Sequence, residues 1–278
     1  MTSSEQNEKP KICLTIAGLD PSGGAGVVAD IKTFSAFSCY AASAITSVTF
    51  QNTTGVLGAV HQTADSVRQQ VQPIIDDLGI HALKTGMLPT GAIIEEVARL
   101  VSENKLKNFV VDPVVRSTSG FDLIDDDALR SLIEHLFPLA DIITPNIPEA
   151  ERISGVAIES ERDIADAASL MREMGAKNVL IKGGHLLPEP GAKATGSKTS
   201  TDFLFLDGEF HKIEGTYHDT TATHGTGCVL SAAITANLAL GRPLLEVVQI
   251  AKAFVNEAIR TALHIGHGHS PINLLTRK

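Results

Sequence analysis

The sequence predicts an α/β protein built on a mostly parallel sheet. Short apolar runs typical of buried strands alternate along the chain with segments whose apolar residues recur at helical spacing. Strands and helices that alternate in this way require right-handed crossovers, which place helices over both faces of the sheet. The 278 residues are 43% hydrophobic and 20% charged, which is enough apolar material for a substantial core.

The alternation begins near the N-terminus. An apolar strand is expected at Lys11–Ala17, followed by a glycine-rich loop and a helix with apolar residues at Val27, Ile31 and Phe34. Further strands are expected at Ala42–Phe50, Ile80–Lys84, Phe109–Asp112, Asp141–Thr144 and Asn178–Lys182. The helices between them are expected at Thr63–Leu78, Gly91–Asn104, Asp125–Phe137 and Arg162–Met174.

The last third of the chain departs from this alternation. Asp202–Leu206 and Glu209–Ile213 flank Asp207-Gly208, a dipeptide typical of a type I′ turn, so a β-hairpin is expected there. Two helices, Thr226–Leu240 and Leu244–His264, are expected to close the chain.

These elements suggest a simple domain organisation. We expect residues 1–10, which are polar, to form a disordered tail and residues 11–278 to form one domain. Residues 183–201 have the composition of a linker, but they lie inside the alternation rather than between two complete cores. We therefore expect them to form a mobile flap.

Composition excludes several classes of partner. Lys and Arg number 23 against 32 Asp and Glu, the net charge is -9, and no basic cluster is present, so nucleic acid is not expected to bind. Thr33–Val60 and Thr220–Gly241 lack charge but carry many polar side chains, so neither is expected to span a membrane. The N-terminus has no apolar signal segment and the 3 cysteines form no CxxC pair, which indicates a reduced, cytoplasmic protein.

A glycine-rich loop, Asp20–Gly26, follows the first strand. Gly24–Ala29 matches the G-x-G-x-x-A form of a dinucleotide fingerprint, but no Asp or Glu lies between Asp30 and Asp65 to hold a ribose. The loop also lacks the Lys-Ser/Thr of a phosphate-binding P-loop. Two interpretations remain open: close approach of a ligand to the backbone, or a tight turn between strand and helix.

Asp30 lies on or beside the apolar face of the helix that follows this loop. A carboxylate in that position needs a partner. A structural pairing with Lys or Arg and a contact to a ligand are both open.

A second glycine-rich segment, Thr223–Cys228, leads directly into a helix of small residues. Free N–H groups at such a helix start can bind a phosphate or a developing oxyanion. The partial positive charge of these N–H groups also lowers the pKa of a thiol in the first turn, which makes Cys228 a candidate thiolate. The alternative is an inert core cysteine, the interpretation we give to Cys13 and Cys39.

Polar side chains also collect at the ends of three later strands. Asp112, the pair Asn146 and Glu149, and Lys182 all follow predicted strands, where ligands of open α/β sheets bind. Carboxylates, an amide and an ammonium group suit Mg²⁺ with a polyphosphate, although Asn146 and Glu149 could simply cap a helix. No metal is expected at His264, His267 and His269, because Gly266 and Gly268 make that segment a flexible turn.

Four of these segments, in this order along the chain, resemble the hydroxymethylpyrimidine/phosphomethylpyrimidine kinases of the ribokinase superfamily: Asp20–Gly26, Asn146–Glu149, Lys182–His185 and His224–Cys228. The resemblance extends from about Lys11 to Asn273. Its most specific parts are Thr15–Gly26 and Thr223–Cys228. The second has Cys where sugar and nucleoside kinases of the superfamily usually have Asp.

This resemblance implies a ribokinase-like, three-layer αβα sandwich and a homodimer. It implies ATP-dependent, Mg²⁺-dependent phosphorylation of a hydroxymethylpyrimidine, then of its monophosphate, for thiamine biosynthesis. The residues implied for the pyrimidine pocket are Gly18, Ala25, Asp30, Gln51 and Met87. Those implied for Mg²⁺ and phosphates are Asp112, Asn146 and Glu149. Of these, Asp112 and Glu149 are implied to hold the metal, partly through water. Lys182 is implied to bind the ATP phosphates. Those implied for the transferring group are Gly225, Thr226, Gly227 and Cys228.

Other functions remain as alternatives. Pyridoxal or pyridoxine kinases share the Cys motif and are the nearest rivals. A nicotinamide oxidoreductase would need an acidic residue for the ribose, which this sequence does not supply. A cysteine hydrolase would use Cys228 with His224 as its base, but no obvious carboxylate orients that histidine. The presence of Lys182 weighs against a pyrimidine-binding regulator without catalytic activity.

Overall fold

The computed structural model describes residues 9–115, 123–183 and 199–275. Residues 1–8 of the expected tail and 184–198 of the expected flap lie outside this described part.

The strands are β1 (Ile12–Leu19), β2 (Tyr40–Asn52), β3 (Gly55–His61), β4 (Ala82–Thr85), β5 (Phe109–Val111), β6 (Ile142–Ile143), β7 (Val179–Ile181), β8 (Thr199–Leu206) and β9 (Glu209–Thr216). The helices are α1 (Gly26–Ala36), α2 (Ala64–Leu78), α3 (Gly91–Glu103), α4 (Asp126–Leu136), α5 (Ile147–Ser154), α6 (Glu161–Glu173), α7 (Thr226–Ala239) and α8 (Leu244–Arg260).

These strands form one sheet in the order β3-β2-β1-β4-β5-β6-β7-β8-β9. Neighbours from β2 to β7 run parallel, whereas β3 is antiparallel to β2, and β8 is antiparallel to β7 and β9. The expected α/β class with a mostly parallel sheet is therefore confirmed. The strand order reverses between β1 and β4, and ligands of such sheets bind in the crevice that a reversal opens at the carboxyl ends.

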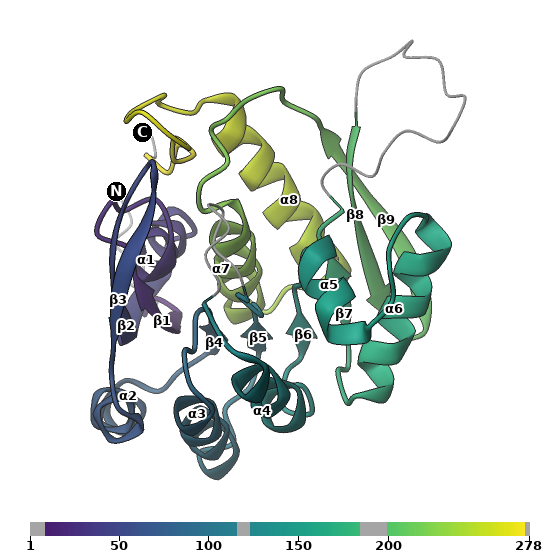
Figure 1. Ribbon diagram of the computed structural model, residues 1–278. Coiled ribbons are helices and arrows are strands. Elements are labelled where there is room, and N and C mark those ends of the chain that lie inside the picture. The colour runs from purple at the N-terminus through teal and green to yellow at the C-terminus, as the bar shows by residue number, and fades with distance from the viewer. Residues whose placement is uncertain (1–8, 116–122, 184–198, 276–278) are drawn as a thin grey trace, which may run out of the picture.

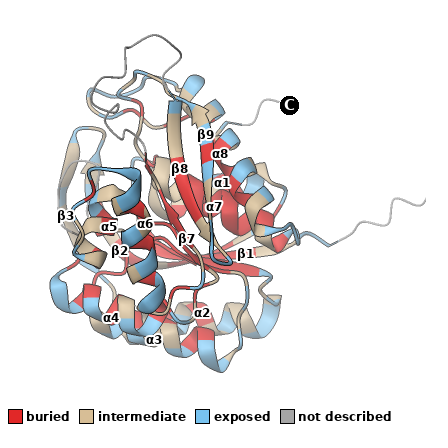
Figure 2. Cartoon of the chain, turned by 90° about the vertical axis from the view of Figure 1, so that its right-hand side faces the viewer, coloured by how far each residue is buried: buried red, intermediate tan, exposed pale blue. Residues whose placement is uncertain are grey.

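Alternate residues of the central strands pack into different clusters of the core. In β5, Phe109 and Val111 pack with residues of α2, α3, α4 and α6, whereas Val110 packs with residues of α7 and α8. Figure 1 shows α2, α3 and α4 grouped apart from α1, α7 and α8. Figure 2 shows buried residues running along the strands and along the inner sides of these helices. Because strand residues that face either side of the sheet are buried, the central strands appear in the sequence as continuous apolar runs.

Short polar side chains define where several helices begin. Thr63, Thr90 and Asp125 each accept a hydrogen bond from an N–H in the first turn of α2, α3 and α4, respectively. Ser160 and Asp163 form a reciprocal capping box at the start of α6. These caps satisfy N–H groups that have no partner within the helix.

Strand β3 was not expected from the sequence. It pairs with an extended β2, and Thr53 and Thr54 lie between the two strands. None of the β3 residues is buried, and its apolar residues Val56, Leu57, Ala59 and Val60 do not alternate with polar ones, so the segment lacks the periodicity of a strand. Helix α8 also differs from the expectation, because it ends at Arg260 rather than at His264; Leu263 and Ile265 beyond it are exposed.

The expected hairpin at the end of the sheet is confirmed. Strands β8 and β9 pair from Thr199 with Thr216 to Leu206 with Glu209. Asp207 and Gly208 have φ values of 51° and 89°, as both central residues of a type I′ turn require.

None of the helices in the described ranges is long and apolar enough to cross a membrane.

A fully buried ion pair joins α1 to β4 at the point where the strand order reverses. Lys84 Nζ lies 2.8 Å from Asp30 Oδ1, both side chains are 0% exposed, and Thr15 Oγ1 donates to Asp30 Oδ2 at 2.6 Å. Burial alone would lower the pKa of Lys84, but the charges of Asp30, Cys228 and Asp112 and the hydrogen bond to Asp30 together raise it. Burial raises the pKa of Asp30, but its two oxygens accept from Lys84 and Thr15, and these contacts favour the carboxylate.

This pair allows a test of the fold's internal electrostatics. Lys84→Met should lower the free energy of unfolding by about 3–5 kcal/mol, because it leaves the Asp30 carboxylate buried without a counter-charge. Combining it with Asp30→Asn should recover part of that loss, since the amide is neutral and still accepts from Thr15. Urea unfolding of both single variants and the double variant measures this; a double variant no more stable than Lys84→Met would contradict it.

Candidate active site

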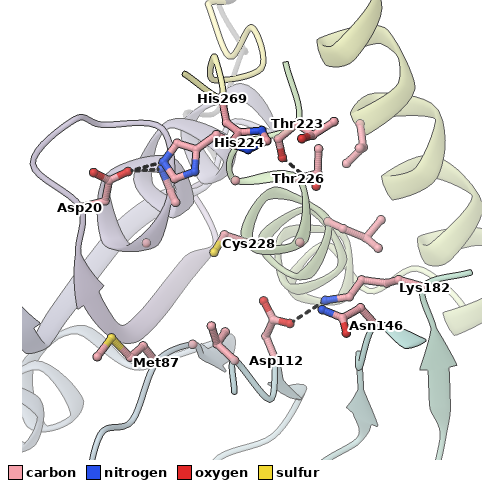
Figure 3. Close-up of a pocket in the computed structure, with 18 of the residues that line it drawn as sticks. Asp20, Met87, Asp112, Asn146, Lys182, Thr223, His224, Thr226, Cys228 and His269 are labelled. Atoms are coloured by element: carbon pink, nitrogen blue, oxygen red, sulfur yellow. Dashed lines mark hydrogen bonds and ion pairs between the residues drawn. The ribbon is translucent and has the colours of Figure 1, made fainter. Parts of the chain in front are cut away.

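The carboxyl ends of the parallel strands open into a cavity of about 790 Å³. Its walls come from the loop after β1, the β2–β3 hairpin, the ends of β4, β5 and β7, and the starts of α5 and α7. Figure 3 shows polar side chains from these separate segments facing one space. The cavity therefore lies where the strand order predicts a ligand site.

Four of the five residues expected to contact a pyrimidine line this cavity: Gly18, Ala25, Gln51 and Met87. Gly18 and Met87 are in close contact, because a Cβ added at Gly18 would lie 3.2 Å from the Met87 sulfur. Thr46 Oγ1 holds the main chain of Met87 by donating to its carbonyl oxygen at 2.6 Å. These contacts fix a narrow, mostly apolar end of the cavity.

Asp30 is the exception and corrects the expectation from the sequence. It is not among the lining residues, because its carboxylate is turned into the core and paired with Lys84. Lys84 itself lines the cavity. Of the two interpretations left open for Asp30, the structure supports the structural ion pair.

Asp112 and Lys182 form a second ion pair inside the cavity, visible in Figure 3. Lys182 Nζ lies 3.0 Å from Asp112 Oδ1, and Thr144 and Ser231 also donate to this carboxylate, each at 3.1 Å. Burial alone would raise the pKa of Asp112, but the charges of Lys182 and Lys84 outweigh it and hold the pKa low. Burial would likewise lower the pKa of Lys182, yet Asp112 raises it. The pair is ionised and fixed in position.

Asn146 and Glu149 serve in a capping box and also line the cavity. Glu149 N donates to Asn146 Oδ1 at 2.9 Å, and Asn146 N donates to Glu149 Oε2 at 2.8 Å. Burial raises the pKa of the Glu149 carboxyl to about 7, although Lys182 Nζ lies only 3.9 Å from Glu149 Oε2 and opposes the shift. Capping and a role in the cavity are thus compatible for this pair.

Asp112 and Glu149 could together hold a hard cation. Asp112 and Glu149 both approach the Nζ of Lys182, so they lie on the same side of the cavity. Within the described ranges, no cluster of three or more His, Cys, Asp or Glu side chains could hold a metal. Two carboxylates with room for water and phosphate oxygens fit Mg²⁺, which seldom relies on protein ligands alone.

The first turn of α7 presents backbone N–H groups to the cavity. Gly225 precedes the helix with φ 82°, and no side chain caps this helix start. Lys182 lies beside it, because a Cβ added at Gly227 would be 3.1 Å from Nζ. Helix N–H groups next to an ammonium group are suited to bind an anion, which is the role that the sequence suggested for this segment.

Cys228 lines the cavity, but the expected lowering of its pKa is wrong. Burial raises the pKa of the thiol to about 11, and the charge of Lys84 and the N–H of Gly26 oppose this only in part. The cost of desolvating a thiolate therefore exceeds the stabilisation that Lys84 and the Gly26 N–H provide. With no ligand bound, Cys228 is a thiol at neutral pH.

The sequence did not reveal the contact between Asp20 and His224, which lie 204 positions apart. His224 Nε2 lies 2.8 Å from Asp20 Oδ2, so the two glycine-rich loops are joined directly (Figure 3). His269 was also unforeseen as a lining residue. Both histidines lie in segments that the sequence marked as unusual, but only the fold brings those segments together.

Comparison with known proteins agrees with this geometry. The model of a family described as phosphomethylpyrimidine kinase matches residues 20–273. A Bacillus subtilis protein named hydroxymethylpyrimidine/phosphomethylpyrimidine kinase is 44% identical over 260 residues, which are 94% of this chain and 93% of that protein.

Solved structures give the same result. The crystal structure of a Clostridium difficile phosphomethylpyrimidine kinase is 40% identical with a TM-score of 0.77, covering 90% of this chain and 99% of that one. A Staphylococcus aureus pyridoxal kinase, solved with AMP-PCP and pyridoxal, is 31% identical with a TM-score of 0.85, covering 96% and 94%. Fold and site thus define an α/β kinase of small molecules. The chain belongs to the phosphomethylpyrimidine kinase family, as the resemblance predicted.

The raised pKa of Glu149 has a measurable consequence for stability. Its folded-state pKa of about 7 exceeds the ordinary 4.5, so from about pH 4.5 to 7 the folded state holds more protons than the unfolded state. Ionisation of Glu149 should therefore reduce stability as the pH rises through this range. The Glu149→Gln variant keeps a carbonyl oxygen for the capping box and should lack this decrease.

The measurement is urea unfolding at about pH 5 and pH 8 with a metal chelator present. We expect the parent to lose stability relative to Glu149→Gln between the two values. A difference between the two proteins that stays constant with pH would show that Glu149 keeps an ordinary pKa.

Proposed function

We propose that this chain uses ATP to phosphorylate the hydroxymethyl group of 4-amino-5-hydroxymethyl-2-methylpyrimidine, and then the resulting monophosphate, for thiamine biosynthesis. One observation carries the proposal. A single cavity holds Lys182 and the α7 helix start, which suit a polyphosphate, together with Gln51 and Met87, which suit a small flat ring. The family to which the chain belongs supports the same reaction.

The transfer of a phosphoryl group depends mainly on positioning and on charge stabilisation. The N–H groups at the start of α7 would receive the charge that develops on the transferring group. Lys182, already 3.0 Å from Asp112, would exchange part of that contact for the phosphate oxygens of ATP. We assign the catalytic role to Lys182 and to residues 225–228.

Mg²⁺ would be held by Asp112 and Glu149, in part through water, with Asn146 beside them. When bound, the ion neutralises charge on the phosphates. Asp112 is kept ionised by its lysine neighbours, so it is ready to bind a cation. Glu149, whose pKa is raised by burial, would be ionised once a cation is bound beside it.

At the end of the cavity that would bind the pyrimidine, recognition would depend on a matching shape and on hydrogen bonds. The amide of Gln51 offers both a donor and an acceptor, which match a ring nitrogen and an exocyclic amine. For the alcohol acceptor, the Cys228 thiolate would take the hydroxyl proton while the oxygen attacks the γ-phosphorus and ADP leaves. The monophosphate acceptor is already ionised at neutral pH and needs no base.

Pyridoxal phosphorylation is the second candidate. The supporting observation is the structural similarity to pyridoxal kinases from Staphylococcus aureus. The identity to that enzyme is 31%, below the 44% to the Bacillus subtilis relative, so we place the pyrimidine first.

We also propose a cytoplasmic homodimer and assign residues 11–278 to one ribokinase-like, three-layer αβα domain. Support for the layers comes from the two separate groups of helices that pack with alternate strand residues. Support for the dimer comes from the β2–β3 hairpin, where Phe50, Leu57 and Val60 are exposed by 51%, 81% and 54%. Sedimentation velocity that found only monomer at micromolar concentration would contradict the dimer.

The proposed function is tested by ATP turnover measured in parallel with hydroxymethylpyrimidine, its monophosphate and pyridoxal. The proposal expects the highest kcat/KM values for the two pyrimidines. A higher kcat/KM for pyridoxal, or no turnover of either pyrimidine, would reject it.

The role of Cys228 makes a prediction about pH. If a thiol with a pKa of about 11 must ionise to act as the base, kcat/KM for the alcohol should rise about tenfold per pH unit from about pH 7.5 to 9.5. The ratio of this value to kcat/KM for the monophosphate removes groups that both steps share. Cys228→Ala should lower the ratio and remove its slope, and a parent ratio that does not change with pH would exclude a thiolate base.

A further inference from the structure

The carboxylate of Asp20 is the centre of a hydrogen-bond cluster between the two glycine-rich loops. Its Oδ1 accepts from Ser22 N at 2.8 Å, and its Oδ2 accepts from Gly24 N at 3.2 Å and Ala25 N at 2.9 Å. Oδ2 also lies 2.8 Å from His224 Nε2. Although burial would raise the pKa of Asp20, the hydrogen bonds of His224 and Ser22 lower it to about 2. The carboxylate is ionised, so His224 Nε2 is the donor.

The two loops are packed so closely that only glycine fits at the contact. A Cβ added at Gly225 would collide with the carbonyl oxygen of Gly24. A Cβ added at Gly24 would lie 2.5 Å from Cδ2 of His224 and 2.9 Å from Cβ of Pro271. The imidazole therefore fills the space between the loop that borders the acceptor end of the cavity and the start of α7.

The main chain of His224 continues this contact toward the β2–β3 hairpin. His224 N donates to Ser270 O at 3.2 Å, and His269 N donates to Thr53 O at 2.8 Å. Thr53 Oγ1 further accepts from the N–H groups of His267 and Gly268, at 3.2 and 3.3 Å. Residues 267–270 thus connect the hairpin that carries Gln51 to the residue just before the helix start.

We propose that His224 and Asp20 are positioning residues for phosphoryl transfer: their contact holds the first turn of α7 against the glycine-rich loop, in line with the acceptor. The inference rests on the proposed function. The inference goes beyond that function because neither His224 nor Asp20 has been given a part in binding phosphate, metal or pyrimidine. A shift of about 1 Å in the N–H groups of this turn is enough to slow transfer by about 10²-fold.

The test uses two variants that differ in the reach of one amide. The side chain of His224→Gln places an N–H group near the position of Nε2, whereas that of His224→Asn reaches only as far as Nδ1. We expect kcat for the pyrimidine alcohol to fall by about 10- to 100-fold in His224→Asn, with KM for the pyrimidine within about threefold of the parent. His224→Gln should recover most of the lost kcat.

Hydrogen exchange of the amides of Thr226 and Val229, which donate to Thr223 O and Gly225 O at the start of α7, gives a second measurement that requires no turnover. Exchange should be faster in His224→Asn than in His224→Gln or in the parent. His267→Gln is the matched control, because His267 uses only its main chain in this cluster, and it should change neither measurement.

The outcomes separate the possible roles. A merely structural role predicts lower melting temperatures while kcat and exchange at Thr226 and Val229 stay unchanged in the folded protein, which would overturn the proposal. Equal loss of kcat in the Asn and Gln variants, or a rise in KM alone, would also overturn it. If the parent itself phosphorylates neither pyrimidine, the proposed function fails, whereas the exchange data still decide whether His224 holds the helix start.

Discussion

The site depends on one steric constraint, the close approach of two glycine-rich loops at the carboxyl edge of the sheet. Gly24 and Gly225 come from loops about 200 positions apart, and neither position has room for a Cβ. Glycine is therefore needed here for backbone contact, and at Gly225 also for a φ of 82°. This contact places the N–H groups of α7 over the same cavity that β1 and β2 border.

Buried charges are arranged in opposite-sign pairs beneath this contact. Lys84 pairs with Asp30, and Lys182 pairs with Asp112. Such pairs add little net stability, because desolvation of the charges offsets their attraction. What they provide is fixed position: each lysine lines the cavity with its charge already oriented. A polyphosphate entering the cavity would meet organised charge rather than mobile side chains, which lowers the cost of reorganisation.

Local sequence patterns predicted the parts of this structure that depend on local physics. Buried strands and amphipathic helices follow from periodicity, and the turn at Asp207-Gly208 follows from the need for two positive φ values. Strand β3 was missed because its apolar residues do not alternate with polar ones and none of them is buried. Asp30 was known to need a partner, but its partner is 54 positions away and only the fold could select it.

The two corrections in the site have the same origin. The helix start was expected to lower the pKa of Cys228, but the depth of the thiol, which no local pattern encodes, reversed the direction. Asp30 was placed in the pocket by resemblance, whereas in the structure its carboxylate is turned into the core and paired with Lys84 of β4. Motifs identified which segments form the site. Burial and long-range pairing determined what each side chain does there.

The central claim is that one cavity aligns the phosphate donor at the start of α7 with a pyrimidine acceptor near Gln51 and Met87. A crystal structure of the chain with AMP-PCP, Mg²⁺ and hydroxymethylpyrimidine would test it most directly. The account predicts the terminal phosphate within hydrogen-bond distance of the main-chain N–H groups of Gly227 and Cys228, with the hydroxymethyl oxygen facing its phosphorus. Phosphates bound away from α7, or a pyrimidine outside the Gly18–Met87 end of the cavity, would contradict it.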